Sequence, residues 1–246
     1  MNDVTYTNAN EKKVICGIQS ATGALANGVI GMQTLTDIAI KLCPEVFPIT
    51  CKLYNAPTII SKDVIVCDPN SSVKPYENSI SGSFTYPSSD KPCSILINKG
   101  KDIFSSACHA WLGKPESVLY RTKSGSFGIK RCLSTSDLPN REMIVWAVGG
   151  LGLLDYFNPD AEGFSGAYAD VLRKTNHTVL GIRNGMCYLQ YFANMTGAQI
   201  NAACRDKMHF DFAIMLDGGH IAAINGTESF AEINMSQYQG YIIQGV

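Results

Sequence analysis

Thr178-Val-Leu-Gly-Ile182 and Met186-Cys-Tyr-Leu-Gln-Tyr191 are two apolar runs on either side of Asn184-Gly185. Asn-Gly favours the positive φ angles of the tight turn that joins two twisted antiparallel strands. The stretch therefore predicts a β-hairpin. Further along, Phe212-Ala-Ile-Met-Leu216 is a continuous apolar run, which is typical of a strand buried on both faces of a sheet.

The segments around this hairpin complete the predicted fold. Residues 197–208 have the apolar spacing of a helix, with Ile200, Ala203 and Cys204 on one side. Upstream, β-rich runs separated by Pro, Asn, Gly and Ser predict strands at 49–54, 64–67, 94–97, 118–121, 127–130 and 143–148. This order predicts an α+β fold with a mixed, largely antiparallel β-sheet core and a few helices.

The first 44 residues have a different pattern. Residues 14–23, a glycine-punctuated loop and residues 35–42 predict a helix, a loop and a second helix, which Pro44 ends. The loop Asn27-Gly-Val-Ile-Gly-Met-Gln-Thr34 resembles the connection between two helices of a peptidoglycan-binding repeat. We therefore expect a short helical segment at 1–44 and a main domain at 45–246. An inert helical cap is the alternative to wall binding.

The composition limits the classes of function. Lys+Arg number 20 and Asp+Glu number 21, so no basic face for nucleic acid is predicted. No apolar run of about 18 residues occurs, and residues 1–13 lack a secretory signal, so we expect a cytoplasmic protein without a membrane contact. The nine cysteines are scattered without a C-x-x-C pair, which predicts buried free thiols. His109 and His209 have no evident partner, and no metal or cofactor is expected.

The sharpest local signal for a functional site is Leu216-Asp217-Gly218-Gly219-His220. A carboxylate at the end of a buried strand, followed by two glycines, lies where backbone N–H groups can approach a ligand closely. The alternative is a tight turn capped by Asp217, and the local sequence favours neither interpretation.

Two further segments offer groups that suit a phosphate. Gly149-Gly150 follows a predicted strand, although it lacks the Lys and Ser/Thr of a P-loop. Asp170, Arg173 and His177 precede the hairpin, where a solvated loop is the alternative interpretation.

Four stretches, in order and spacing, are similar to motifs of the phosphodiester glycosidase family, in the form found in phages and Gram-positive bacteria. They are Asn78-Ser-Ile-Ser81-Gly82-Ser83-Phe84, Ala147-Val-Gly149-Gly150 with Leu153-Leu154, the run from Arg173 through Asn176-His177-Thr178 to Gly181, and Leu216-Asp217-Gly218-Gly219. The resemblance covers residues 47–246. Ser81 stands where the family usually has Asn, and His220 stands where a third Gly is common.

The resemblance implies a hydrolase that cleaves the bond between a sugar's anomeric carbon and a phosphodiester, on a small-molecule or polymer-borne substrate. On it we assign Asp217 and Glu162 as the working carboxylates, with Arg173 and His177 on the phosphate. The residues assigned to substrate binding are Ser81, Gly82, Gly149, Gly150, Asp170, Gly218, Gly219 and His220. A phage-encoded enzyme of this kind would act in the host cell.

Two other functions stay open at this point. The same pocket could bind a phosphorylated sugar or nucleotide without turnover, with Ser81 and His220 as marks of lost chemistry. The chain could instead be a cell-wall accessory factor, in which residues 14–42 contact peptidoglycan.

Overall fold

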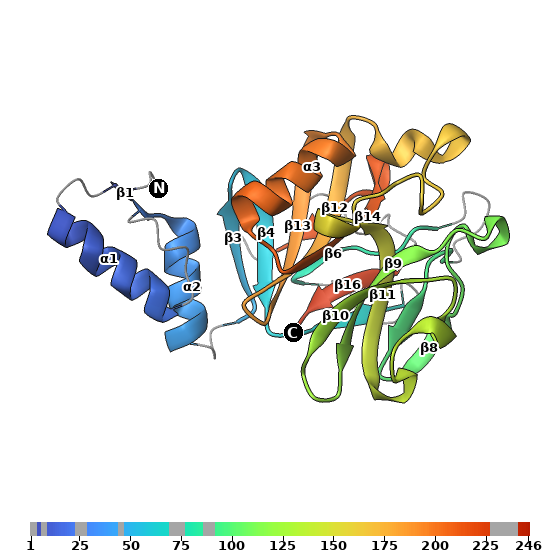
Figure 1. The fold of residues 1–246 in the computed structure, drawn as a ribbon, viewed down its shortest axis with the longest axis horizontal. Coiled ribbons are helices and arrows are strands. Elements are labelled where there is room, and N and C mark those ends of the chain that lie inside the picture. Colours follow the sequence, from blue (N-terminus) through green and yellow to red (C-terminus); the bar gives the residue numbers. More distant parts are fainter. Residues whose placement is uncertain are drawn as a thin grey trace. The chain divides into compact units, whose positions relative to one another are not determined.

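The computed structural model describes residues 4–5, 9–22, 29–43, 47–68, 77–85, 92–226 and 241–246. The chain divides into two compact units, Met1–Phe47 and Pro48–Val246 (Figure 1). Every strand pair within the described ranges is antiparallel. The predicted α+β fold with a largely antiparallel sheet core is confirmed.

In the smaller unit, α1 (Ala9–Thr22) and α2 (Met32–Leu42) pack against each other. Two short strands, β1 (Val4–Thr5) and β2 (Val29–Ile30), pair beside them. The predicted order of helix, loop and helix is confirmed.

A buried amide links the two helices of the smaller unit. The Nε2 of Gln19 on α1 donates to the carbonyl of Val29 at 2.8 Å and to Oγ1 of Thr34 at 3.1 Å. Thr34 in turn donates to the same carbonyl of Val29. Asn27 and Gly28 of the repeat-like loop lie outside the described residues, and the contact with peptidoglycan stays a prediction.

The larger unit contains two sheets. The large sheet runs, in spatial order, through β10 (Phe127–Cys132), β9 (Glu116–Thr122), β11 (Ile144–Gly152), β14 (Phe212–Gly218), β12 (Thr175–Arg183), β13 (Met186–Met195), β4 (Ala56–Ser61) and β3 (Ile49–Leu53), while β7 (Leu96–Asn98) pairs with β11 and with β8 (Lys101–Phe104). The small sheet runs through β15 (Ile224–Asn225), β6 (Ser79–Ser81), β16 (Ile242–Gly245) and β5 (Val64–Cys67).

Strand β14 is central in the large sheet and buried on both faces, as its apolar run predicts. Ile214 and Leu216 belong to the main core, which they share with Ile80 of the small sheet. Met215 points the other way, because its Cε lies 3.6 Å from where a Cβ of Gly197 on α3 would stand. Alternating side chains therefore pack against the small sheet on one face and α3 on the other.

The helix predicted at 197–208 is confirmed, with a change of geometry at its end. It consists of α3 (Gly197–Ala203) followed by a π turn, η7 (Cys204–Met208). Thr196 and Gln199 form a reciprocal capping box, in which each side chain accepts the other's backbone N–H. In Figure 1, α3 lies over β12 and β13.

Short 3-10 helices of one to about two turns connect the strands. They are the 3-10 helices η2 (Ala110–Leu112), η3 (Thr135–Asp137), η4 (Arg141–Met143), η5 (Leu154–Tyr156), η6 (Gly166–Leu172) and η8 (Gly219–Ile221). Within the described ranges, no helix has both the length and the apolar character that crossing a membrane requires.

The predicted hairpin is confirmed as β12 and β13, which pair from Arg183 and Met186 outward. Asn184 and Gly185 have φ angles of 51° and 72°, as this two-residue turn requires. Strand β4 was not predicted, because its turn from β3 uses Tyr54 and Asn55 at positive φ without a glycine to mark it.

We expect Gly185→Ala to lower the free energy of unfolding of the larger unit by about 1 kcal/mol. No atom lies within 4 Å of the added Cβ, so the cost comes from the positive φ alone. Urea denaturation measures it. Gly17→Ala is the control, since its Cβ also meets open space but its position in α1 favours alanine. Equal loss in both variants would contradict the explanation.

Candidate active site

The two sheets meet where β14 ends at Asp217. The backbone N–H of Asp217 donates to the carbonyl of Gly82 at 3.3 Å. The buried hydroxyl of Thr178 lies 2.9 Å from the carbonyl of Ser81 and 3.1 Å from that of Asp217, and it donates to this pair. One hydroxyl from β12 therefore fixes the end of β6 beside the end of β14.

The carboxyl group of Asp217 is held in an environment that disfavours its charge. Burial raises its pKa from 3.8 to about 7, although an N–H of Gly218 donates to Oδ1 at 2.9 Å. Negative charge on Cys108 and Asp170 raises the pKa further, and a hydrogen bond from the backbone of Thr85 lowers it. A carboxyl group with this pKa can exchange a proton near neutral pH.

The segment before the hairpin reaches the same place as the Asp217 strand end. His177 pairs with Gly218 across β12 and β14, and the guanidinium Nη2 of Arg173 lies 3.8 Å from where a Cβ of Gly219 would stand. Gly219 has a φ of 73°, which favours glycine. The structure thus brings Asp170, Arg173, His177 and the 217–219 turn together.

His177 is placed inside this arrangement, where it does not present a charge. Its ring is buried, and a Cβ at Gly218 would lie only 2.7 Å from Nδ1. Nε2 lies 3.2 Å from the carbonyl of Arg173, to which it can donate. Burial lowers the pKa of His177, which favours the neutral ring. His177 therefore supports Gly218 and Arg173, and its expected role on the phosphate stays a prediction.

Several glycines assigned to substrate binding have structural reasons instead. Gly149 and Gly150 lie inside β11 and not in a turn, so the expectation that a turn there donates to the ligand is wrong. The N–H of Gly149 donates to the carbonyl of Ile95, and a Cβ there would lie 2.2 Å from Glu116 Oε1. A Cβ at Gly150 would lie 2.6 Å from the carbonyl of Met215.

Ser81 at the end of β6 and the following Gly82, both assigned to substrate binding, make hydrogen bonds within the protein. Ser81 is buried, and its hydroxyl accepts the backbone N–H of Ala223 at 3.0 Å. The N–H of Gly82 donates to the backbone carbonyl of Tyr241. A Cβ at Gly82 would lie only 2.6 Å from that carbonyl oxygen. The side chain of His220 lies outside the described residues.

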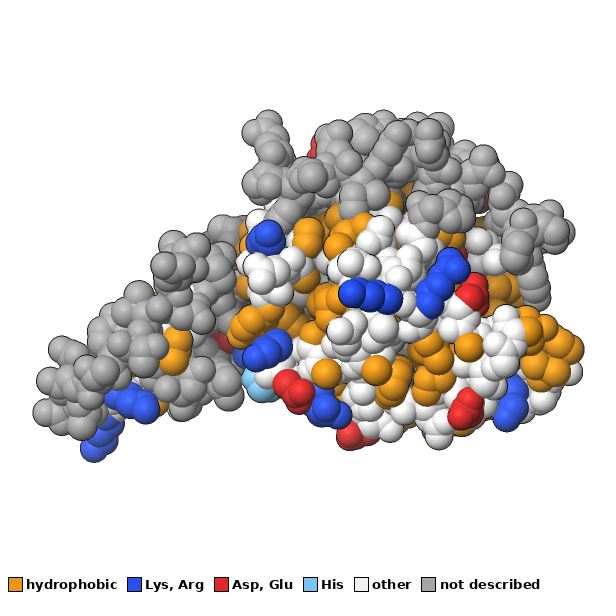
Figure 2. All heavy atoms as spheres, turned by 90° about the horizontal axis from the view of Figure 1, so that it is seen from above, with side chains coloured by type: hydrophobic (Ala, Val, Ile, Leu, Met, Phe, Trp, Pro, Cys, Tyr) orange, Lys and Arg blue, Asp and Glu red, His pale blue; other side chains and the backbone are white. Residues whose placement is uncertain are grey.

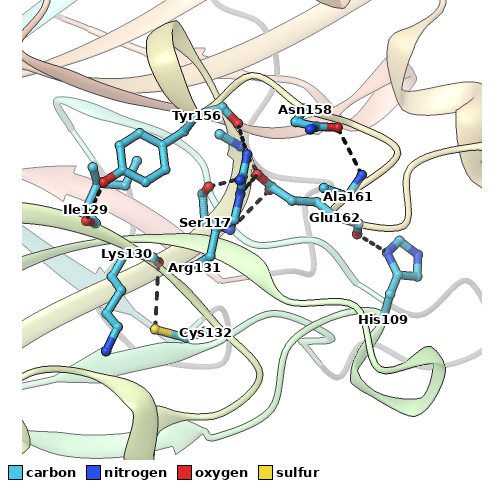
Figure 3. A network of polar contacts seen from close by, with 11 residues as sticks. His109, Ser117, Ile129, Lys130, Arg131, Cys132, Tyr156, Asn158, Ala161 and Glu162 are labelled. Atoms are coloured by element: carbon cyan, nitrogen blue, oxygen red, sulfur yellow. Dashed lines mark hydrogen bonds and ion pairs between the residues drawn. The ribbon is translucent and has the colours of Figure 1, made fainter.

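Glu162 lies at the centre of a buried hydrogen-bond network (Figure 3). Oε1 accepts from Ser117 Oγ at 2.9 Å and from Arg131 Nε at 3.2 Å, while Oε2 accepts the N–H groups of Ser117 and Gly152, each at 3.1 Å. The side chain is 0% exposed. These four donors occupy both oxygens, so Glu162 fixes its loop to β9 and β11.

Sequence reasoning missed a cluster of four residues, of which Cys93 and Cys108 interact electrostatically with Asp217. Cys93 and Cys108 have their Sγ atoms 3.4 Å apart, and His109 Nε2 lies 3.9 Å from Cys108 Sγ. The fully buried Glu116 accepts hydrogen bonds from the N–H of Cys108. It also accepts from the N–H of Ile95 and the hydroxyl of Ser94, which follow Cys93. Burial raises the pKa of Glu116 to about 8. No local motif marks this cluster, because its members come from segments that fold together.

A series of aromatic rings leads from this cluster to the surface. Phe84 contacts Phe164, His109 contacts both Phe164 and Tyr168, and Tyr168 contacts Trp111, with ring centroids 4.8 to 6.3 Å apart. Phe84 and Phe164 are buried, whereas the side chain of Trp111 is 67% exposed. An apolar surface thus extends outward from the backbone that carries Cys108.

The surface charges are mixed in sign. On the face drawn in Figure 2, Lys and Arg side chains of the described residues lie among Asp and Glu. Among the described residues, no group of three or more His, Cys, Asp or Glu side chains is placed to hold a metal ion.

No family model and no curated protein matches the sequence. Among solved structures, the chain is similar to the zebrafish N-acetylglucosamine-1-phosphodiester alpha-N-acetylglucosaminidase catalytic domain auto-inhibited by its pro-peptide, with 13% identity, a TM-score of 0.54, and coverage of 79% of this chain and 80% of that one. It is also similar to a hypothetical protein from Synechocystis, with 10% identity, a TM-score of 0.50, and coverage of 77% of this chain and 59% of that one. At these identities the likeness concerns the fold.

We expect Glu162→Gln to lower the free energy of unfolding by about 2–4 kcal/mol. The amide would place N–H groups against two buried donors and leave them unpaired. Asp160→Asn, an exposed change on the same loop, should alter stability by less than about 0.5 kcal/mol. Denaturant titration of both variants measures this; a Glu162→Gln protein as stable as Asp160→Asn would rule out the structural role.

Asp217 should make the folded state less stable as pH rises. Because its folded pKa exceeds the unfolded value, the folded chain binds more protons between about pH 4 and pH 7, and stability present at low pH is lost across that window. Relative to Asp217→Asn, the wild type should lose on the order of 2 kcal/mol between those limits, after discounting for solvent screening. Urea denaturation at several pH values tests it, and parallel curves would contradict the burial of this charge.

Proposed function

We propose that this chain is a hydrolase that cleaves the bond between the anomeric carbon of a sugar and a phosphodiester. The observation that carries the proposal is the position of Asp217, whose carboxyl group has a pKa of about 7 and which begins the glycine turn that the guanidinium of Arg173 reaches at Gly219. The fold likeness to a phosphodiester glycosidase domain supports the choice of reaction.

The ionised form of Asp217 does the chemical work in this proposal. The leaving phosphate is already a stabilised anion, so it needs little protonation, unlike the alcohol released in ordinary glycoside hydrolysis. The carboxylate can then activate water or stabilise positive charge at the anomeric carbon. Asp170 is the nearby second carboxylate, since its charge acts on Asp217 and its side chain is exposed.

Arg173 is the group we assign to the phosphate. It is exposed, and its planar guanidinium can bind two phosphate oxygens at once. His177 holds the Arg173 backbone and fills the space over Gly218, so it positions the phosphate site from beneath.

The aromatic series offers a surface for the sugar. Apolar and aromatic side chains with a few polar groups are the usual lining of small-molecule sites. Trp111 and Tyr168 expose ring surface next to His109, and sugar C–H groups pack well against such rings. Glu162, which we first assigned to catalysis, holds the loop that carries Phe164.

The direct test is release of sugar from a panel of sugar 1-phosphodiesters. Asp217→Asn should lower kcat/KM by about 10²- to 10⁴-fold, because it removes the acid–base group. Asp160→Asn should leave kcat/KM unchanged. Full activity in Asp217→Asn would remove the assignment, and tight binding of unchanged substrate without turnover would favour a binding protein.

The pH profile tests the role of the Asp217 carboxylate. We expect kcat/KM to rise with pH through about 7, because the working form is ionised above its pKa. Asp170→Asn removes a neighbouring negative charge, lowers the pKa of Asp217 and moves this rise to lower pH. Glu142→Gln, on the exposed part of η4, should not move it. A rate that falls through pH 7 would instead make Asp217 the general acid.

A further inference from the structure

Cys93 and Cys108 form a thiol pair that the proposed hydrolysis does not use. Their sulfur atoms are 3.4 Å apart, which is van der Waals contact, whereas a disulfide bond is about 2.05 Å long. Cys93 is buried and Cys108 is half-buried. A small approach of the two sulfurs would therefore allow a bond between them.

The backbone around the two cysteines is held in place from several directions. The N–H of Cys93 donates to the carbonyl of Phe84 at 2.9 Å. Glu116 accepts the N–H of Cys108 at 3.2 Å and the hydroxyl of Ser94 at 2.8 Å. One buried carboxylate thus links both cysteine segments, which pre-organises the pair for reaction.

His109 supports the thiolate form of Cys108. Its Nδ1 lies 3.0 Å from the carbonyl of Glu162, which can only accept, so Nδ1 carries a proton. Nε2 then faces Cys108 Sγ and can donate to it as the imidazolium. Hydrogen bonds from Cys93 and His109 lower the pKa of Cys108. The hydrogen bond between Cys108 and His109 also raises the pKa of His109.

We propose that Cys108 and Cys93 are a reversible oxidation site that reacts with hydroperoxides and closes into a disulfide beside Asp217. The Cys108 thiolate attacks one oxygen of hydrogen peroxide, so that an S–O bond forms, the O–O bond breaks and hydroxide leaves as water with a proton from His109. The Cys93 sulfur then attacks Cys108, and the S–O bond breaks with loss of a second water. Two thiols supply the two electrons that reduce one peroxide, and an added dithiol then reduces the disulfide back to two thiols and is itself oxidised to a disulfide.

Closing the disulfide changes the charge that faces Asp217. The groups around that carboxyl group are Cys108, Cys93, Asp170 and the N–H groups of Thr85 and Gly218. His177 and Arg173 lie behind the glycine turn. A disulfide carries no charge, so it lowers the pKa of Asp217. This consequence rests on the proposed function, whereas the thiol chemistry does not.

The test uses the reduced full-length chain, treated with hydrogen peroxide and then alkylated. Trypsin cleaves at Lys99 and Lys101, between the two cysteines, so mass spectrometry identifies linked peptides. We expect a Cys93–Cys108 disulfide that dithiothreitol reverses. In Cys93→Ser, Cys108 should instead be trapped as a sulfenic acid by dimedone, and in Cys108→Ser no disulfide at Cys93 should form.

The exposed Cys43 is an internal control in every sample. At about pH 6, Cys108 should alkylate about tenfold faster than Cys43, since the contacts with Cys93 and His109 stabilise the Cys108 thiolate. Faster reaction at Cys43, or no Cys93–Cys108 disulfide after peroxide, would overturn the proposal. In an active enzyme, oxidation should also move the rise of kcat/KM to lower pH. If the disulfide forms but the chain has no hydrolase activity, the proposed function is contradicted and the thiol proposal stands.

Discussion

The hydroxyl of Thr178 is the contact on which the site depends. It is buried, and it donates to the carbonyls of Ser81 and Asp217 where the small sheet meets the central strand of the large one. Threonine suits this position, because its short side chain brings one hydroxyl donor to two backbone carbonyl groups that come from different strands. This hydroxyl and the hydrogen bond from the Asp217 N–H to the Gly82 carbonyl together hold the ends of β6 and β14 side by side, and burial at this junction raises the pKa of Asp217.

Three buried carboxyl groups lie near one another in the chain's fold, and their surroundings give them different properties. Glu162 accepts four hydrogen bonds, of which the one from Arg131 is also an ion pair, and these fix its loop. Burial raises the pKa of Glu162, and the four donors act against that rise. Glu116 is fully buried without a cation among its hydrogen-bond donors, and its pKa rises to about 8. Asp217 has fewer donors and partial contact with solvent, which leaves it able to change protonation near neutrality. Carboxyl groups of similar intrinsic acidity are thus separated by desolvation and donor number.

Local chemistry explains which parts of the fold the sequence could predict. The Asn184-Gly185 turn and the apolar run of β14 are encoded by neighbouring residues, and both predictions are confirmed. The expectation that Gly149 lies in a turn was wrong, because contacts between distant segments place it inside β11 against Glu116. Such contacts also place His177 against Gly218, and its role on the phosphate stays a prediction. The thiol pair was also unpredictable for this reason, since only folding brings Cys93 to Cys108. The sequence did indicate that Asp217, Arg173 and the glycine turn share one place.

A carboxyl group that is half-ionised near neutral pH is sensitive to every charge beside it. In water, the negative charges of Cys108 and Asp170 would be screened, but partial burial lowers the effective dielectric constant and lets each of them act on Asp217. Of these two neighbours, Cys108 can lose its charge by bonding to Cys93, a reaction that the side chain of Asp170 does not have. The burial that raises the pKa of Asp217 therefore also makes this pKa respond to the charge of Cys108.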